Sequence, residues 1–293
     1  MLGNDNRIKF IRWLLFGLIL ANLFIWLVAA QGSRNKYLET EFFDVGQGDA
    51  AFIQTPNGIQ VLVDGGPDSG VLEKLGQAMP FYDRDIDWVV LSHPDRDHLA
   101  GLLAVLKNYR VHNVLWSGIP KDTAESDEWI DLVAKEKANI VIGSAGEEFD
   151  LGGNPGLMLQ VLAPVSGADS SAASSNESSI VVRFVYGARS FVFAGDADNA
   201  EEQGMVDADP DLQTDILKVA HHGSKNSANE SLLEDLLPAV AVISVGAQNP
   251  YGHPSAEVLE MLAKYDIKTL RTDQNGDVVF RTDGDQIFLK TQK

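Results

Sequence analysis

The longest apolar stretch of the chain lies near its amino terminus. Residues 13–30 are apolar except for Asn22, three Lys or Arg residues precede this run, and two follow it. At about 1.5 Å per residue, such a helix spans about 27 Å, enough for the hydrocarbon core of a bilayer. The pattern predicts a membrane anchor at 13–30 within a segment 1–36, which also holds a cytoplasmic tip and a short linker. A cleaved signal peptide ending near Ala30 and a buried core helix are the alternatives.

Beyond residue 36, short apolar segments alternate with turn residues, first as a β-meander and then as strand-helix units. A serine-rich stretch at 166–179 predicts a surface loop, after which the same plan begins again. Hairpin turns are predicted around residues 56–58, 187–188, 275–276 and 283–284. Two successive halves of this kind predict an α/β domain at 37–293, with two sheets packed face to face and helices outside. The first half predicts strands at 38–43, 50–55, 59–63, 88–91, 113–116 and 139–142 and helices at 99–107 and 125–135.

Composition and charge narrow the possible functions. The chain has 23 Lys and Arg against 42 Asp and Glu, a net charge of −19, and residues 37–293 alone carry 18 against 41, or −23. The basic surface typical of nucleic-acid-binding proteins is therefore absent, although bound metal ions could supply positive charge to a nuclease. Because the chain has no cysteine, any metal ion must be held by His, Asp or Glu.

The densest group of potential metal ligands is the run Ser92-His-Pro-Asp-Arg-Asp-His98, placed between an apolar strand and an apolar helix. It contains His93, Asp95, Asp97 and His98, and imidazole with carboxylate suits Zn, Mn or Fe when thiolates are missing. The alternative without a metal site is a solvated helix start with Asp97 as its N-cap. The clustering at a strand-to-helix turn favours a metal site.

Four further segments place polar residues at strand ends or in a loop before a helix. His221 and His222 follow the strand at 215–220, Asp196 follows the strand at 190–194, and Asp64 precedes a glycine pair. His253 lies in a loop before a predicted helix. Each has an ordinary structural alternative, as a capping, turn or packing residue. The strand-end positions of Asp196, His221 and His222 are typical of active-site residues in layered α/β folds.

Six motifs together resemble the metallo-β-lactamase-fold domain of ComEC-type competence proteins, over about residues 38–290. The resemblance implies an αββα sandwich, one or two Zn²⁺ or Mn²⁺ ions, and hydrolytic activity. A metal-binding run alone would indicate only the wider superfamily, whereas the segments 46–49 and 221–224 narrow the resemblance to the competence branch. The motifs cover residues 44–49, 64–66, 92–98, 195–196, 218–224 and 251–254.

The resemblance implies a role for each motif residue. His93 and Asp95 would face one metal ion, Asp97 and His98 the other, and Asp196 would bridge the two. One of His221 and His222 would complete the second site, with His222 preferred because it directly precedes the glycine. Asp97 would also orient or deprotonate the attacking water and His253 would protonate the leaving group, with Asp64, Gly48, Asp49 and Ser224 in supporting positions.

One departure from the superfamily pattern concerns the first site. His112 is the only histidine between His98 and Asp196, and it has no partners in sequence, so a further histidine that many members use has no clear counterpart. The segment 176–179 is a candidate replacement, and the first site is expected to be weak or to fill only with substrate.

The expected function is a single-pass, membrane-anchored, extracytoplasmic metal-dependent hydrolase, a nuclease or phosphodiesterase linked to DNA uptake. Single-stranded DNA is the expected substrate, although the acidic domain gains little affinity from counterion release. If the amino-terminal segment is cleaved, the domain would be secreted. A hydrolase of small esters, lactones or lactams and a catalytically weak binding protein are the alternatives.

Overall fold

The computed structural model describes residues 4–32, 37–153, 155–165, 178–208 and 212–291, and the chain divides into two compact units, 1–36 and 37–293. The first unit contains helix α1 (Asn4–Gly32), in which Asn6–Val28 has a mean hydropathy of 2.1 and contains no buried residue. By length and composition this helix could cross a membrane. It is longer than the predicted segment 13–30 because the polar flanking residues continue the helical backbone.

The second unit begins with an eight-stranded sheet in the order β15-β14-β1-β2-β3-β4-β5-β6. Strands β14, β1, β2 and β3 pair antiparallel, and β3 to β6 pair parallel. The turn at 56–58 joins β2 to β3 as predicted. The strands are β1 (Leu38–Phe42), β2 (Ala51–Gln54), β3 (Gln60–Val63), β4 (Asp85–Val90), β5 (Arg110–Trp116), β6 (Asn139–Ile142), β14 (Val278–Thr282) and β15 (Ile287–Thr291).

A second, seven-stranded sheet has the order β13-β12-β11-β10-β9-β8-β7. Its strands β7 to β10 are antiparallel and β10 to β13 are parallel, which repeats the plan of the first sheet. The strands are β7 (Glu148–Gly153), β8 (Gly156–Ala163), β9 (Val181–Tyr186), β10 (Arg189–Phe193), β11 (Ile216–Lys218), β12 (Val240–Ile243) and β13 (Lys268–Arg271).

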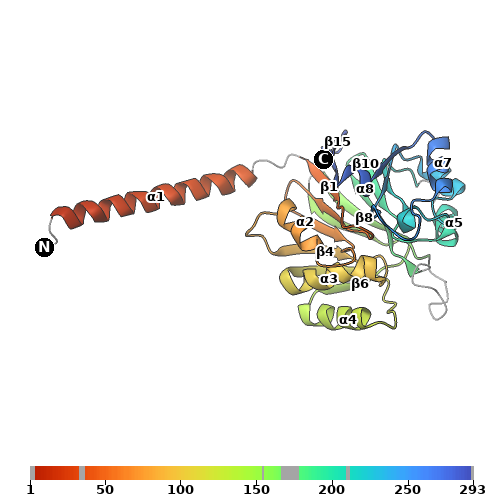
Figure 1. Ribbon diagram of the computed structural model, residues 1–293, viewed down its shortest axis with the longest axis horizontal. Helices are drawn as coiled ribbons and strands as arrows, with labels where there is room; N and C mark the ends of the chain where they lie inside the picture. Colours follow the sequence, from red (N-terminus) through yellow and green to blue (C-terminus); the bar gives the residue numbers. More distant parts are fainter. Residues whose placement is uncertain (1–3, 33–36, 154, 166–177, 209–211, 292–293) are drawn as a thin grey trace. The chain divides into compact units, whose positions relative to one another are not determined.

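Helices cover the outer faces of both sheets (Figure 1). The predicted αββα sandwich is thus confirmed. The first sheet carries α2 (Val71–Ala78), α3 (Arg96–Asn108) and α4 (Ala124–Glu136); the second carries α5 (Asn199–Ala208), α6 (Glu230–Leu236) and α7 (Ala256–Lys264). Helix α2 and the β7–β8 hairpin are additions to the predicted elements, and residues 166–177 of the predicted serine-rich loop lie outside the described residues.

The core between the sheets combines aliphatic side chains with aromatic rings. Phe42 of β1 stacks on Phe193 of β10 with ring centroids 5.3 Å apart, so the two sheets are joined by direct ring contact. The edge-side strand β8 alternates buried and half-buried positions, whereas β3 and β11 are buried along their whole length. This is expected because the parallel strands are covered on both faces by helix and sheet.

The hairpin predicted at Asn275-Gly276 is wrong. Strands β13 and β14 belong to different sheets, and the short helix α8 (Thr272–Asn275) connects them. Gly276 has a φ of 66° and its N–H donates to the Thr272 carbonyl, while the Asn275 side chain accepts from the Arg271 N–H at 2.9 Å. The Asn-Gly pair therefore ends a helical turn here instead of forming a hairpin.

Helix α3 packs against the loop after β3 so closely that one position admits only glycine. A Cβ on Gly101 would lie 1.8 Å from the Gly65 carbonyl oxygen, and the Gly101 N–H donates to the Gly66 carbonyl at 3.0 Å. This contact fixes the loop that carries Asp64 against the helix that carries Asp97 and His98.

We expect Gly101→Ala to lower the free energy of unfolding by about 1–3 kcal/mol through overpacking, although alanine is the better helix former by about 1 kcal/mol. Gly76→Ala in α2 is the matched control, since its Cβ would meet nothing within 4 Å, and it should stabilise. Urea unfolding of both variants measures the difference. Equal stabilisation by both substitutions would contradict the close contact.

Candidate metal centre

The candidate residues meet at one edge of the sandwich, beyond the carboxyl ends of the central strands. His93 follows β4, Asp64 follows β3, Asp196 follows β10, and His222 lies in the short helix η2 (Ala220–Gly223) after β11. Layered α/β folds commonly place their sites at this edge, because loops from neighbouring parallel strands converge there. Residues spread along the sequence thus become neighbours.

The run 92–98 enters helix α3 and presents two buried rings. His93 and His98 are 1% and 0% exposed, and their ring centroids are 4.2 Å apart. The alternative that Asp97 caps the helix does not hold. Helix α3 begins at Arg96 with Asp95 in the N-cap position, and Asp97 lies in its first turn, near His222.

Asp196 lies at the centre of the cluster and faces two groups of imidazoles. Its Oδ1 is 3.2 Å from His98 Nε2 and 4.0 Å from His222 Nε2, while its Oδ2 is 3.8 Å from both His93 Nε2 and His221 Nε2. A carboxylate in this position could bridge two ions. The groups that could hold one ion include His93-His98-Asp196 and Asp97-His98-His222.

The turn of η2 sends consecutive histidines in different directions. His221 and His222 have φ values of 50° and 53°, so both adopt the left-handed backbone conformation that residues other than glycine seldom take. Their ring planes are inclined by 79°. His222 is buried, and its Nδ1 lies 2.9 Å from the Ser244 carbonyl. That carbonyl accepts a hydrogen bond from Nδ1, and Nε2 faces Asp97 Oδ2 at 3.2 Å.

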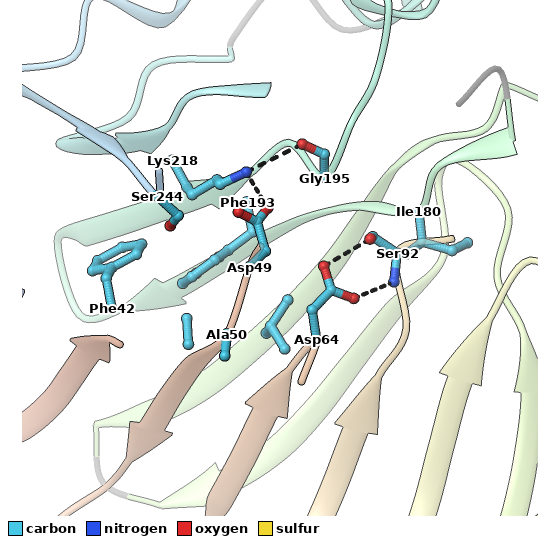
Figure 2. A pocket seen from close by; sticks show the side chains of 12 residues that line it. Phe42, Asp49, Ala50, Asp64, Ser92, Ile180, Phe193, Gly195, Lys218 and Ser244 are labelled. Atoms are coloured by element: carbon cyan, nitrogen blue, oxygen red, sulfur yellow. Dashed lines mark hydrogen bonds and ion pairs between the residues drawn. The ribbon is translucent and has the colours of Figure 1, made fainter. Parts of the chain in front are cut away.

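Asp64 holds Ser92 and His98 of the cluster in position. Its carboxylate accepts the Ser92 N–H at 2.8 Å and the Ser92 hydroxyl at 2.7 Å (Figure 2), and it lies 2.8 Å from His98 Nδ1. These contacts fix the ring of His98 with Nε2 toward Asp196. The sequence motif contains Ser92, but Ser92 was not among the predicted site residues.

A buried ion pair lies next to this support. The Lys218 ammonium contacts Asp49 and donates to the Gly195 carbonyl at 3.3 Å (Figure 2), and Asp49 Oδ1 is 3.3 Å from His222 Nδ1. Lys218 is another residue that the prediction missed. A lysine inside the apolar strand at 215–220 was the available signal, because a buried ammonium needs a partner.

Two of the predicted supporting residues act through the backbone. Gly48 comes so close to α3 that a Cβ would lie 2.4 Å from the Asp97 carbonyl oxygen, and the next N–H, from Asp49, donates to that oxygen at 3.1 Å. Ser224 stays within its own turn, where its N–H donates to the His221 carbonyl. The Gly48 loop therefore positions Asp97, and Ser224 closes the histidine turn.

Electrostatics at the cluster favour a bound cation. Burial lowers the pKa of both His98 and His222, but the nearby carboxylates, Asp196 first, outweigh it and raise the pKa of His98 well above its usual value and that of His222 to about 9. Burial and the charge of His98 lower the pKa of His93 to about 4. The carboxylates thus create a negative potential that demands positive charge.

Buried ligand atoms fit a divalent ion in the same place. Several buried polar atoms of the described residues make no well-formed hydrogen bond, and three of them meet here: His93 Nε2, His98 Nε2 and Asp196 Oδ1, of which the last two face each other at 3.2 Å. Buried polar atoms are normally satisfied, so these unsatisfied atoms indicate that something else contacts them. Imidazole nitrogens around a shared carboxylate are suitable donors for Zn²⁺ or Mn²⁺.

Two predicted residues lie at the rim. Asp95 Oδ1 is 4.0 Å from His93 Nε2 and 2.8 Å from the Lys121 ammonium, a partner that the sequence did not indicate. The half-buried His253 ring is 5.7 Å from His221, and burial, with the charges of His222 and His221, lowers its pKa. Asp95, at the start of α3, and His253, in the loop before α7, thus approach the buried histidines from different segments.

The segment proposed to replace the missing histidine is only partly described. Residues 176 and 177 lie outside the described residues, whereas Ser178 and Ser179 are buried. The following N–H, from Ile180, donates to the Ser92 carbonyl at 2.8 Å, which ties this segment to the histidine run. Ile180 also lines the pocket of Figure 2, whose roughly 10 Å³ admits about one water and is too small for a substrate.

A family model describes most of the folded unit. Residues 43–247 match the metallo-β-lactamase superfamily. The chain belongs to this superfamily. The αββα sandwich and the strand-end position of the ligands agree with that membership. Helix α1 and the strands β14 and β15 lie outside the matched range.

Comparison with curated proteins confirms the resemblance to the competence branch. The chain is 34% identical to ComE operon protein 3 of Bacillus subtilis over 265 residues, which cover 83% of this chain and 33% of that protein. It is 32% identical to Recombination protein 2 of Haemophilus influenzae, covering 90% and 31%, and 30% identical to competence protein ComA of Neisseria gonorrhoeae, covering 81% and 31%. The chain therefore spans about one third of the length of these relatives.

A solved structure supports the fold alone. CmlA, a diiron β-hydroxylase from Streptomyces venezuelae, superposes with a TM-score of 0.55 at 15% identity, covering 85% of this chain and 55% of that chain. At this identity the likeness concerns the arrangement of the two sheets and carries nothing about the reaction.

Proposed function

We propose that the folded unit is a metal-dependent phosphodiesterase that cleaves single-stranded DNA and takes part in DNA uptake. The observation that carries the proposal is Asp196, whose two oxygens face separate groups of imidazoles within 4.0 Å. The competence and recombination proteins named above support DNA as the substrate. A metal-dependent hydrolase is the coarser statement that superfamily membership supports.

We assign two ion positions on either side of Asp196. The first would be held by His93 and Asp95, with His221 on the same side of the carboxylate, and the second by Asp97, His98 and His222. Zn²⁺ and Mn²⁺ both suit this donor set, and the carboxylates favour Mn²⁺ slightly. When bound there, such ions activate a water molecule for attack and stabilise the leaving oxygen of a phosphodiester.

The protein's own groups orient the reactants. Burial would raise the pKa of Asp97, but a hydrogen bond from His222 and the charge of His98 hold it well below its usual value. Asp97 therefore stays ionised at neutral pH and can orient the attacking water by accepting a hydrogen bond from it. His253, in the loop before α7, would interact with the leaving group.

The anchor and the orientation are part of the proposal. Helix α1 would hold the chain in the membrane, and the excess of Lys and Arg before residue 13 supports an extracytoplasmic position of the folded unit. The net charge of −23 on residues 37–293 limits attraction of DNA by the protein surface. Binding would then depend on the ions and on local contacts near them.

A cleavage assay tests the proposed function. The full chain in detergent is incubated with labelled single-stranded DNA and Mn²⁺ or Zn²⁺, with chelator, and beside Asp97→Ala. We expect cleavage that requires metal and is lost in the variant. A folded, metal-loaded protein that leaves DNA intact with both ions would reject the nuclease and direct attention to small esters, lactones and lactams.

The two neighbouring histidines should contribute to metal binding separately. Because His221 and His222 face opposite oxygens of Asp196, each single alanine variant should lose about one equivalent of metal, and the double variant about two. Inductively coupled plasma mass spectrometry after dialysis measures this content. His112→Ala is the control, since that ring pairs with Asp85 at the surface. Unchanged content in His221→Ala would remove it from the ligand set.

A further inference from the structure

An exposed aromatic ring stands beside the candidate metal centre. Tyr251, in the loop between β12 and α7, is 67% exposed, and its ring lies nearly parallel to that of His253, with centroids 5.7 Å apart and planes inclined by 28°. An exposed tyrosine ring that stacks on a residue of the candidate metal centre is suited to bind a ligand. Neither the metal ligands nor the proposed reaction requires it.

The loop that carries this ring is organised in advance. The side-chain oxygen of Asn249 accepts the N–H groups of Tyr251 at 3.2 Å and His253 at 3.0 Å, and its amide donates to the carbonyls of Gly246 and His253. The Gly246 N–H in turn donates to the Gln47 side chain at 3.1 Å. A ligand on Tyr251 would therefore meet a ring carried by an ordered loop, so that binding loses little free energy to ordering the backbone.

The stacked rings of Tyr251 and His253 lead toward the proposed second ion position. The His253 ring lies 6.5 Å from that of His222, with the planes inclined by 30°. Two ring-to-ring steps therefore connect the exposed Tyr251 face with a residue at the proposed second ion position. A nucleotide next to a phosphodiester held at the ions could reach this face with its base.

We propose that Tyr251 is a stacking platform for a base of single-stranded nucleic acid, next to the phosphodiester that is cleaved. This inference rests on the proposed function. Every base has a flat aromatic face, so stacking binds single strands without sequence preference and without positive charge. That is the kind of affinity available to a domain of net charge −23, which gains little from phosphate contacts.

Steady-state cleavage of labelled single-stranded DNA with Mn²⁺ tests the platform in the full chain. Tyr251→Ala should raise KM about tenfold with kcat unchanged, and Tyr251→Phe should keep the wild-type KM. The effect should disappear on a strand with abasic sites. Phe81→Ala is the matched control, because Phe81 is 70% exposed but precedes the amino end of β4, away from the cluster.

Binding of a cleavage-resistant phosphorothioate strand, followed by fluorescence anisotropy, separates the two proposals. Cleavage with a KM that Tyr251→Ala leaves unchanged would reject the platform and retain the nuclease. Tyr251-dependent binding without cleavage would support the platform and reject the nuclease. Neither binding nor cleavage by the folded, metal-loaded protein would reject both.

Discussion

Replacing Asp196 by alanine should abolish metal binding at both proposed positions and lower kcat/KM by at least about 10³-fold, which corresponds to the several kcal/mol that bound metal ions supply. The reason is geometric. This carboxylate is the group that contacts imidazoles on both sides, with Oδ1 toward His98 and Oδ2 toward His93 and His221. Removing any other single ligand should leave one position intact. Metal content after dialysis and single-stranded DNA cleavage measure the two effects.

Asp198→Ala is the matched control, because Asp198 lies two residues further along the same loop. Its carboxylate accepts the N–H groups of Ala200 at 2.8 Å and Glu201 at 3.1 Å at the start of α5. Losing this cap should cost about 1 kcal/mol of stability and leave the metal content unchanged. Full metal content in Asp196→Ala would contradict the bridging role, whereas loss of metal in both variants would indicate a general disturbance of the loop.

Local patterns were enough to predict much of the site. The run from His93 to His98 lies within one strand-to-helix turn, so its members are neighbours whatever the rest of the fold does. Asp64 and Asp196 were predicted because each ends an apolar strand, and strand ends of layered folds converge. The resemblance supplied the pairing of these groups, which periodicity alone does not contain.

Other features depend on contacts between distant segments. The different orientations of His221 and His222 follow from the left-handed turn of η2 and from the Ser244 carbonyl, which lies 22 residues further along the chain than His222. The connection at Asn275-Gly276 was predicted wrongly, because a turn signal does not say whether the next strand joins the same sheet. Lys121 approaches Asp95 from a separate loop, a contact with no local signature.

The buried pair of Lys218 and Asp49 should contribute strongly to stability. The two residues are 3% and 5% exposed, and the Lys218 charge is the chief influence that holds the Asp49 pKa down against burial. Lys218→Met, measured in chelator so that metal does not contribute, should lower the free energy of unfolding by about 3–5 kcal/mol, because it removes the chief positive partner of a buried carboxylate. Lys218→Met combined with Asp49→Asn should recover part of that loss.

The surface pair of Lys107 and Glu128 provides the matched control. Lys107 Nζ lies 2.7 Å from Glu128 Oε1, and the two side chains are 49% and 45% exposed. Lys107→Met should cost less than about 1 kcal/mol, because water screens that pair. Equal costs for the two lysine variants would mean that the Lys218 ammonium gains little from Asp49. A much larger cost for Lys218→Met would show that the buried ion pair stabilises the fold next to the candidate metal centre. Asp49 joins the two, because it contacts both Lys218 and the ring of His222.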